Sequence, residues 1–370
     1  MCLLTAAACG GEPPSTGPTP WVWDLPPGFP EPQVPADNPM SAPKVELGRR
    51  LFFDPRLSRN ETQSCASCHE PALAFSDGRA TSSGSTGELG RRNAMSLANV
   101  AYASTLLWAN PSVDALETQA LGPLLQTDPV ELGWDGGAGE LEARLDGIPG
   151  YRRRFAEAFP DDPQPISLTN VTRALAAFQR TLISGDSPCD RYLHGDEEAI
   201  SASARRGLEL FFSERLECFH CHGGFAFTQS TVHAGSGFVE APFHNTGLYN
   251  VDGRGAYPAK DQGLYEETGD PADMGRFRAP TLRNVAVTAP YMHDGSIPDL
   301  EGVIDHYARG GREIVDGPYA GDGRQSFLKS GFVSGFRITP REREDLIAFL
   351  RTLTDQAFLS AERFSPPPLP

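Results

Sequence analysis

The chain contains the five-residue pattern Cys-x-x-Cys-His twice, once as CASCH from Cys65 and again as CFHCH from Cys218. This pattern is typical of c-type haem attachment. Two thiols at this spacing can form thioethers with the two vinyl groups of one porphyrin, and the histidine that follows is placed to ligate the iron. The sequence therefore predicts two covalently bound haems, held by Cys65, Cys68 and His69 and by Cys218, Cys221 and His222.

Zinc is the alternative occupant of these motifs, because Cys65, Cys68, Cys218 and Cys221 form a set of four. The two pairs of a structural zinc site usually lie about 15–20 residues apart, whereas these pairs lie at 65–68 and 218–221. Zinc also gives no reason for a histidine after both pairs. The remaining cysteines are Cys2, Cys9 and Cys189, and the set as a whole is not the disulfide framework of a small secreted domain.

The surroundings of the first motif predict an open iron site. No histidine lies between His69 and His194, and Met95 is the only methionine in that span. The first haem is therefore predicted to lack a strong distal protein ligand and to be open to a small molecule such as peroxide.

The second haem has several candidates for its distal ligand. In the segment 299–311, helical periodicity places Leu300, Val303, Ile304 and Tyr307 on one face. Tyr307 is therefore predicted to point inward and His306 not to, although on this pattern alone an ordinary core tyrosine is the better interpretation. The candidates are His233, His244, Met274, Met292, His293, His306 and Tyr307.

Helices are predicted to position these motifs. Ser167–Ile183 is amphipathic, Ser201–Phe212 is a second helix, and Thr339 to Glu342 form a capping box with proline at the first helical position. Long loops rich in glycine and proline separate the helices, as at 235–280, and alternating strands are scarce. The predicted fold is mostly α, with long loops and little β.

An internal repeat divides the chain. GRRLFFDPRL at 48–57 matches GLELFFSERL at 207–216, and each copy runs into a Cys-x-x-Cys-His motif. The motif is therefore predicted to be duplicated together with its preceding helix, in two cytochrome c domains that meet near 184–196. The predicted organisation is a signal or lipoprotein-box remnant at 1–9, a Pro/Gly-rich tether at 10–42, an N-terminal domain at 43–190, a C-terminal domain at 191–360 and a Pro-rich tail at 361–370.

The N-terminus and the net charge bear on location and partners. Small residues before Cys9 resemble the end of a secretory signal and a bacterial lipoprotein box. Export to the periplasm is predicted, with lipid anchoring at Cys9 left open and an untranslocated, disordered N-terminus as the alternative. The net charge of −16 argues against nucleic acid as a partner. No apolar run of about 18 residues follows the N-terminus, so no membrane span is predicted.

With these residues in view, the segment 43–355 resembles the bacterial di-haem cytochrome c peroxidase/MauG family. The motifs that carry the resemblance occur in the family's order: LGRRLFFDPRLS, CASCHEPALAFSDGR, RRNAMSLANVAY, LETQALGPLLQTDPVELG, FRAPTLRNVAVTAPYMHDGS and LEGVIDHYARGG. The segment WVWDLPPGFPEP…DNPMSAPKVELG further resembles the MbnH-like branch. Members of that branch accompany a copper-binding partner and oxidise a tryptophan on it.

The resemblance implies roles for single residues. The first haem would bind peroxide, and the second would be low-spin and store an oxidising equivalent. Trp108 corresponds to the tryptophan that lies between the haems and couples them, with a core tryptophan as the alternative. Gln119, Pro123 and Glu131 correspond to the distal pocket of the first haem, although the spacing before Gln119 and Glu131 is slightly longer than usual. Glu131 would transfer the peroxide proton, and Pro123 would restrict the sixth position.

At two places the sequence differs from the classic di-haem peroxidases and resembles MauG-type enzymes. The loop ATSSGSTGELGRRNAMS contains no histidine that could block the first haem, and Tyr307 stands where peroxidases have a methionine ligand and MauG-type enzymes a tyrosine. A phenolate stabilises high oxidation states of iron, so the resemblance implies Tyr307 as a ligand of the second haem. It also implies a Ca²⁺ site formed by Asn93 and the backbone carbonyls of Arg278 and Pro280, with a turn-capping asparagine as the alternative.

The expected function is that of an exported di-haem cytochrome c that reacts with hydrogen peroxide. The leading hypothesis is a MauG/MbnH-type oxidase that oxidises tryptophan or tyrosine on a partner protein, such as a small exported copper-binding protein, by long-range electron transfer. One alternative is a peroxidase that removes hydrogen peroxide with electrons from a small cytochrome or cupredoxin. A non-enzymatic electron carrier is the second alternative, which the missing distal histidine argues against. His220 and Cys189 have no predicted role, and His244 is predicted to be structural.

Overall fold

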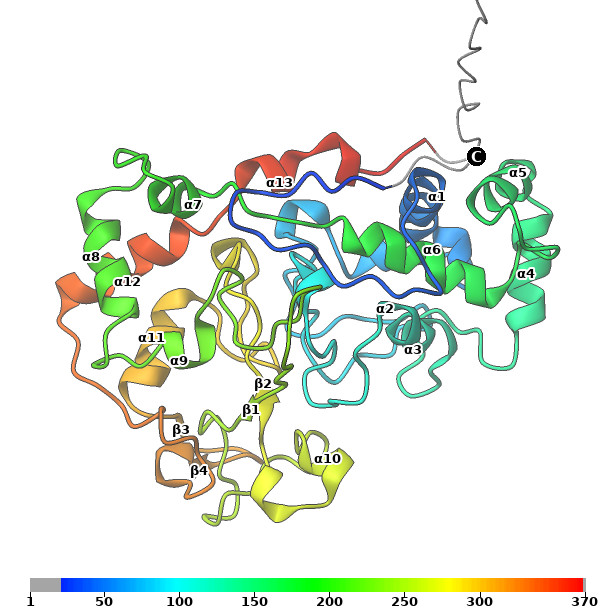
Figure 1. Ribbon diagram of the computed structural model, residues 1–370. Helices are drawn as coiled ribbons and strands as arrows, with labels where there is room; N and C mark the ends of the chain where they lie inside the picture. The colour runs from blue at the N-terminus through cyan, green and yellow to red at the C-terminus, as the bar shows by residue number, and fades with distance from the viewer. Residues whose placement is uncertain (1–20, 369–370) are drawn as a thin grey trace, which may run out of the picture.

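The computed structural model describes residues 21–368, so the predicted signal with Cys9 lies outside the described residues. Within this range the chain consists of short helices joined by long loops, with two antiparallel pairs of two-residue strands (Figure 1). No helix in this range is long and apolar enough to cross a membrane. The predicted mostly α fold with little β is confirmed.

The two halves of the chain carry their helices in sequence order. The N-terminal half contains α1 (Ala42–Phe53), α2 (Leu116–Gln119), α3 (Leu121–Leu125), α4 (Ala138–Asp146), α5 (Pro149–Ala158) and α6 (Leu168–Arg180). The C-terminal half contains α7 (Pro188–Leu193), α8 (Ala202–Phe211), α9 (Phe219–His222), α10 (Tyr265–Thr268), α11 (Leu300–Ala308), α12 (Pro340–Arg351) and α13 (Gln356–Ser360). The strand pairs are β1 (Phe243–His244) with β2 (Phe277–Arg278), and β3 (Glu313–Ile314) with β4 (Gly321–Asp322). The predicted helices form as α6 and α8, and the predicted capping box begins α12.

Each half is built on one close pair of helices, α1 with α6 and α8 with α12. Gly48 of α1 faces the carbonyl of Ala174, and Gly207 of α8 faces the carbonyl of Asp345. A Cβ atom at either glycine would lie 1.9 Å from that carbonyl oxygen. The glycine that recurs in both copies of the repeat therefore allows two helix backbones to touch.

Replacing Gly207 with alanine is expected to lower the free energy of unfolding by about 1–3 kcal/mol, because the two helices must separate to admit the methyl group. The matched control is Gly139→Ala in α4, where a Cβ would meet no atom within 4 Å. That change is expected to be neutral or to stabilise by up to about 1 kcal/mol, since alanine favours helix. Urea unfolding followed by circular dichroism measures both. Equal effects of the two substitutions would contradict the close approach of α8 and α12.

The junction between the halves begins as a buried polar network around Ser184. The amide side chain of Asn99 donates to the Ser184 carbonyl (2.9 Å) and accepts from its N–H (3.0 Å). Asn284 donates to the Ser184 hydroxyl (2.9 Å) and accepts from the N–H of Asp355 (2.8 Å). The Asp355 carboxylate in turn accepts from the Ser184 hydroxyl and from the next two backbone N–H groups, at 3.0–3.1 Å. The two halves are thus joined by hydrogen bonds between buried groups.

Asn99 and Asn284 occupy matching positions in the two halves. Both have a left-handed backbone, with φ of 60° and 62°, directly before a 3-10 turn. Both N–H groups bind a leucine carbonyl, at 2.7 Å and 2.9 Å. The surrounding sequences also match, LANVA at 97–101 with LRNVA at 282–286, and FQRTL at 178–182 with FLRTL at 349–353. The sequence reasoning missed these two repeats, which involve the partner helices α6 and α12 as well.

Residues 21–41 are not the tether that their composition predicts. Phe29 packs against Tyr102 and Phe225, with ring centroids 6.0 Å and 5.0 Å away, and the Tyr102 hydroxyl donates to the carbonyl of Pro30 (2.8 Å). Because Tyr102 and Phe225 belong to different halves, this segment contacts both of them (Figure 1, blue). The prediction failed because aromatic and proline residues can bury apolar surface without helical or strand periodicity.

The last described residues return to the N-terminal half. Phe358 of α13 and Phe364 lie in its core beside Phe75, and α13 lies near α1 and α6 in Figure 1. A guanidinium N–H of Arg49 donates to the carbonyl of Ser365 (3.0 Å). The predicted boundaries, a C-terminal domain up to 360 and a loose tail from 361, do not describe this segment, because its two phenylalanines complete the core of the other half.

Candidate functional site

The first Cys-x-x-Cys-His motif follows α1 and begins with a single 3-10 turn, Cys65–Ser67. Nδ1 of His69 lies 2.7 Å from the carbonyl oxygen of Phe75, to which the neutral ring donates. Burial lowers the pKa of His69 and so favours that neutral ring. Nε2 is then a free acceptor, which is the usual arrangement of a metal-ligating histidine. The two thiols and this histidine fit a covalently attached haem.

The structure brings Glu131 to this motif. Burial, together with the charges of Cys68 and Glu131, raises the pKa of the Cys65 thiol to about 12. The loop that carries Glu131 is held by its own carbonyl, which accepts from the N–H of Ser85 (2.8 Å), and by the N–H of Leu132, which donates to the carbonyl of Pro123 (2.9 Å). Burial also raises the pKa of Glu131. A half-buried carboxyl group beside the motif, with a raised pKa, is suited to proton transfer.

The other two predicted distal residues lie on the helices next to this loop. Gln119 is the last residue of α2 and Pro123 lies in α3, and both are half-buried. The backbone bond from Leu132 connects Pro123 to the Glu131 loop, whereas the Gln119 side chain makes no hydrogen bond to any described residue. The structure therefore groups Pro123 with Glu131 and leaves the contact of Gln119 undefined.

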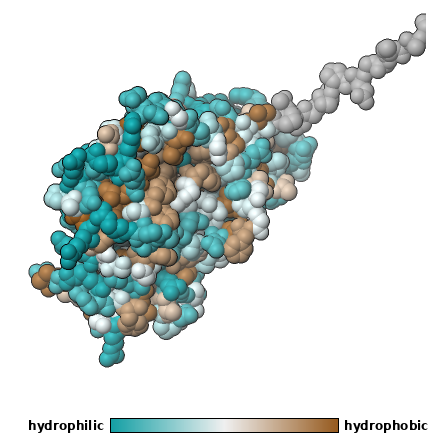
Figure 2. All heavy atoms as spheres, turned by 60° about the vertical axis from the view of Figure 1, so that its left-hand side comes forward, coloured by the Kyte–Doolittle hydropathy of each residue, from teal (hydrophilic) through white to brown (hydrophobic). Residues whose placement is uncertain are grey.

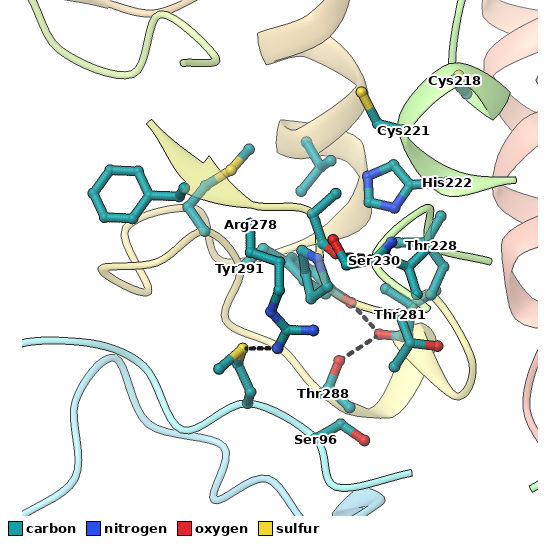
Figure 3. Close-up of a pocket in the computed structure, with 18 of the residues that line it drawn as sticks. Ser96, Cys218, Cys221, His222, Thr228, Ser230, Arg278, Thr281, Thr288 and Tyr291 are labelled. Carbon is teal, nitrogen blue, oxygen red and sulfur yellow. Dashed lines mark hydrogen bonds between the residues drawn. The ribbon is translucent and has the colours of Figure 1, made fainter. Parts of the chain in front are cut away.

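The second motif lines a cavity of about 240 Å³, which also has residues of the N-terminal half on its wall (Figure 3). We call it the second cavity. Cys221 and His222 project from α9 toward this cavity, and Cys218 lies at the start of the same helix. Burial lowers the pKa of His222 to about 4, against the opposing effect of the carbonyls of Phe227 and Pro280. Phe75 and Phe227 follow their motifs at similar distances, and both have positive φ, 62° and 49°. The second set of residues thus also fits a haem, although Nδ1 of His222 makes no hydrogen bond to a described residue.

Four of the seven candidates for the distal ligand line this cavity: His244, Met292, His293 and Tyr307. Tyr307 lies close enough to the two thiols that their charges, after burial, raise the pKa of its phenol. The imidazole of His293 stacks on Phe277 at 3.6 Å, and His244 contacts the amide of Gln229. Tyr307 is therefore placed toward the motif, as the helical pattern predicts.

His306 is a correction to the same pattern. Its side chain is buried, and Nε2 lies 3.0 Å from the carbonyl of Thr246. Burial lowers its pKa to about 4. The prediction considered only the face of α11 that lines the cavity. The loop at 246–247 covers a second face of this helix and buries His306 there.

Trp108 lies where the two halves meet. Its indole N–H donates to the carbonyl of Asn93 (2.8 Å), and its own carbonyl accepts from the N–H of Arg278 (2.8 Å). Trp108 packs in a buried cluster with Tyr249, Tyr257 and Phe277 and lines the second cavity. Asn93, Arg278 and Pro280, the predicted calcium residues, line that cavity as well. Trp108 and the three predicted calcium residues thus line the same cavity.

The structure also locates the residues that had no predicted role. Cys189 is 0% exposed in the core of the C-terminal half, and burial raises the pKa of its thiol to about 11. Nε2 of His220 lies 2.8 Å from a carboxylate oxygen of Glu217, and the ring stacks on Phe332 at 4.5 Å. His244 lies on the cavity wall, where burial lowers its pKa. Cys189 is a core residue, and His220 belongs to the outer edge of the second motif.

Two haem-attachment motifs on a mostly helical scaffold define a di-haem c-type cytochrome, and comparison with known proteins agrees. The family model described as di-haem cytochrome c peroxidase matches residues 42–198. The methylamine utilization protein MauG of Methylorubrum extorquens is 39% identical over 321 residues, which cover 86% of this chain and 80% of that protein. Cytochrome c551 peroxidase of Pseudomonas aeruginosa is 32% identical over 317 residues, which cover 86% of this chain and 80% of that protein.

Solved structures give the same result. A crystal structure of a MauG-like protein associated with microbial copper homeostasis is 53% identical, with a TM-score of 0.92 over 94% of this chain and 99% of that chain. The diheme peroxidase BthA from Burkholderia thailandensis has the same fold, with a TM-score of 0.67 at 23% identity over 90% of this chain and 92% of that chain. The chain belongs to the di-haem cytochrome c peroxidase/MauG family. It is a haem-dependent oxidoreductase of the class that uses hydrogen peroxide with a protein substrate or electron donor.

Proposed function

We propose that this chain is a MauG/MbnH-type oxidase, which uses hydrogen peroxide to oxidise a tryptophan or tyrosine on a docked partner protein. The position of Tyr307 carries the proposal, because its phenol lies beside the second motif, where a phenolate ligand would stabilise high oxidation states. The span between His69 and His194 contains no histidine that could close the first site. Both features favour an enzyme that meets peroxide without prior reduction.

In this function, side chains of the chain itself have separate tasks. The bound haems supply the peroxide-binding and electron-transfer chemistry. Glu131 accepts a proton from the inner peroxide oxygen and returns it to the outer one. Pro123 would restrict the space at the sixth position of the first haem. Trp108 connects the two halves as an oxidisable indole. Its N–H is held by Asn93, and its carbonyl is held by Arg278.

The partner is proposed to be a small exported copper-binding protein that docks beside the second motif. The 53% identical MauG-like protein is associated with microbial copper homeostasis. Phe212, Phe327 and Phe332 are exposed in the C-terminal half, and Phe332 also lines the second cavity. Figure 2 shows apolar residues gathered among hydrophilic ones on the face that is turned forward. Such a surface suits a protein partner.

A periplasmic location, a bound calcium ion and an internal duplication are also part of the proposal. Covalent haem attachment outside the cytoplasm supports a periplasmic location, with lipid anchoring at Cys9 left open. The shared cavity wall supports a calcium ion bound by Asn93 and by the carbonyls of Arg278 and Pro280. The matching environments of Gly48 and Gly207, and of Asn99 and Asn284, support an internal duplication of one cytochrome domain.

Stoichiometric hydrogen peroxide added to the fully oxidised protein tests the proposal. The high-spin ferric EPR signal is expected to disappear within the mixing time, and a candidate partner mixed with the product is expected to gain mass on a tryptophan or tyrosine. A protein that stays unchanged until one haem is reduced would favour the second candidate, a cytochrome c peroxidase. The 32% identity to cytochrome c551 peroxidase keeps that candidate in view.

Tyr307→Phe tests the proposed ligand separately. The low-spin EPR signal of the second haem is expected to shift, because a phenyl ring cannot bind iron. Tyr291→Phe is the matched control, since Tyr291 lines the same cavity but its hydroxyl donates to the carbonyl of Val285 (2.9 Å). That control is expected to leave the signal in place. An unchanged signal in Tyr307→Phe would show that another residue fills the position.

A further inference from the structure

Arg278 is a buried cation without a counter-ion among the described residues. Its side chain lines the second cavity, and the residue is only 8% exposed. One terminal N–H donates to the sulfur of Met95 (2.9 Å), and the buried Nε has no hydrogen-bond partner. A guanidinium stays protonated in proteins, so this side chain carries its charge at neutral pH. A thioether sulfur is a weak acceptor, and it does not neutralise this charge.

The other deeply buried arginines of the chain show what is missing. Arg180, with 4% of its side chain exposed, donates to both carboxylate oxygens of Glu117 at 2.8 Å. Arg283, with 2% exposed, donates to both oxygens of Asp190 at 2.8 Å and 2.9 Å. Isolating a buried charge costs several kcal/mol. Arg278 could donate to both oxygens of a carboxylate, as Arg180 and Arg283 do, but no described carboxylate accepts from it.

No carboxylate of the residues that the structure describes pairs with Arg278 in this cavity. Glu217 is the one acidic residue on its lining; its Oε2 lies 2.8 Å from Nε2 of His220, and its carboxylate forms no ion pair with Arg278. Figure 3 shows the Arg278 side chain extending within the cavity that Cys221 and His222 face, toward the contact with the Met95 sulfur. The missing anion must therefore come from whatever fills this space. A porphyrin joined to Cys218 and Cys221 brings carboxylates of its own.

We propose that the Arg278 guanidinium binds a propionate carboxylate of the porphyrin attached at Cys218 and Cys221. The fork of N–H groups suits a carboxylate bidentately. The pair anchors the porphyrin edge next to Trp108, whose carbonyl already accepts from the Arg278 backbone. It also places a positive charge beside the second haem, which favours the reduced state of that haem. The proposal requires haem attachment but not the MauG-type activity.

Arg278→Met tests this role, because it keeps much of the length and removes the charge. Resonance Raman spectra of the holoprotein are expected to show a shifted propionate bending band, and the midpoint potential of the second haem is expected to fall. Arg278→Lys is expected to retain most of the potential. Met95→Leu is the matched control, since it removes only the sulfur contact, and it is expected to leave both readouts unchanged. Haem content, measured as the pyridine haemochrome, establishes that each variant carries two haems.

Several outcomes would overturn the proposal. An Arg278→Met protein with two haems, an unchanged propionate band and an unchanged potential would reduce Arg278 to a packing role. Should that variant fail to fold, a crystal structure of the wild-type holoprotein decides, because the guanidinium must lie within hydrogen-bond distance of a porphyrin carboxylate. Acetate is the probe for the other source of the same chemistry. A saturable spectral change with acetate would show that the site is open to free carboxylates and that the propionate does not fill it.

Discussion

Glu131→Gln is expected to slow the reaction with hydrogen peroxide by about 10²–10⁴-fold, the usual contribution of a general acid–base group. Glutamine keeps the size and a carbonyl acceptor but cannot carry the proton. Stopped-flow mixing of the fully oxidised variant with peroxide measures the rate. Glu88→Gln is the matched control, because Glu88 is exposed and accepts from the N–H of Val130 (2.8 Å), on the same loop as Glu131. Its rate is expected to stay near that of the wild type.

The pH dependence of the same reaction gives an independent check. Glu131 must begin as a carboxylate to accept the first proton, so the rate falls as the pH falls through the pKa of Glu131. Burial raises that pKa, so the acid limb is expected at a higher pH than the ordinary value of about 4.3 for glutamate. Glu131→Gln is expected to lack this limb. A variant with the wild-type rate and the wild-type pH profile would remove Glu131 from the proton transfer.

Asp190→Asn is expected to lower the free energy of unfolding by about 3–5 kcal/mol, because it leaves the buried Arg283 cation without its counter-ion. Asp190 accepts from Arg283 at 2.8 Å and 2.9 Å, and from the N–H and hydroxyl of Ser187 at 2.9 Å and 2.7 Å. The guanidinium also lies over the rings of Phe29 and Phe227, at 4.9 Å and 5.5 Å. One ion pair therefore connects α7, the segment that follows the second motif, and the N-terminal segment. Urea unfolding of the holoprotein measures the loss.

Asp186→Asn is the control for that change, because Asp186 and Arg191 form an exposed pair and exposed pairs contribute about 0–1 kcal/mol. The pH dependence separates the two cases further. Burial alone would raise the pKa of Asp190, but Arg283 and Ser187 outweigh it and lower that pKa below its usual range. The stabilisation is thus complete above about pH 4 and is lost as the pH falls through the lowered pKa. The wild type is expected to show this acid loss, and Asp190→Asn a smaller one. Equal losses in Asp190→Asn and Asp186→Asn would contradict the buried pair.

Local chemistry in the sequence was enough for the haem motifs and the main helices. Cys-x-x-Cys-His is read correctly without a structure because its five residues act together, and the family comparison agrees with the reading. The amphipathic pattern of α6 and the capping box of α12 are likewise local features, and both helices form as predicted. The inward position of Tyr307 followed from the period of one helix face, whereas its role as a ligand is implied only by the family resemblance.

Only the tertiary structure decided which distant groups meet. The pattern of α11 could not show that His306 is buried against the carbonyl of Thr246, because the covering loop lies some 60 residues earlier in the chain. Composition could not show that Phe29 packs between two halves, or that Phe364 completes the core of the opposite half. The sequence also could not show that Arg278 is buried without a counter-ion, because buried and solvent-exposed arginines are written in the same way. Burial and long-range pairing depend on the packed chain, whereas covalent attachment and helix formation depend on a few neighbouring residues.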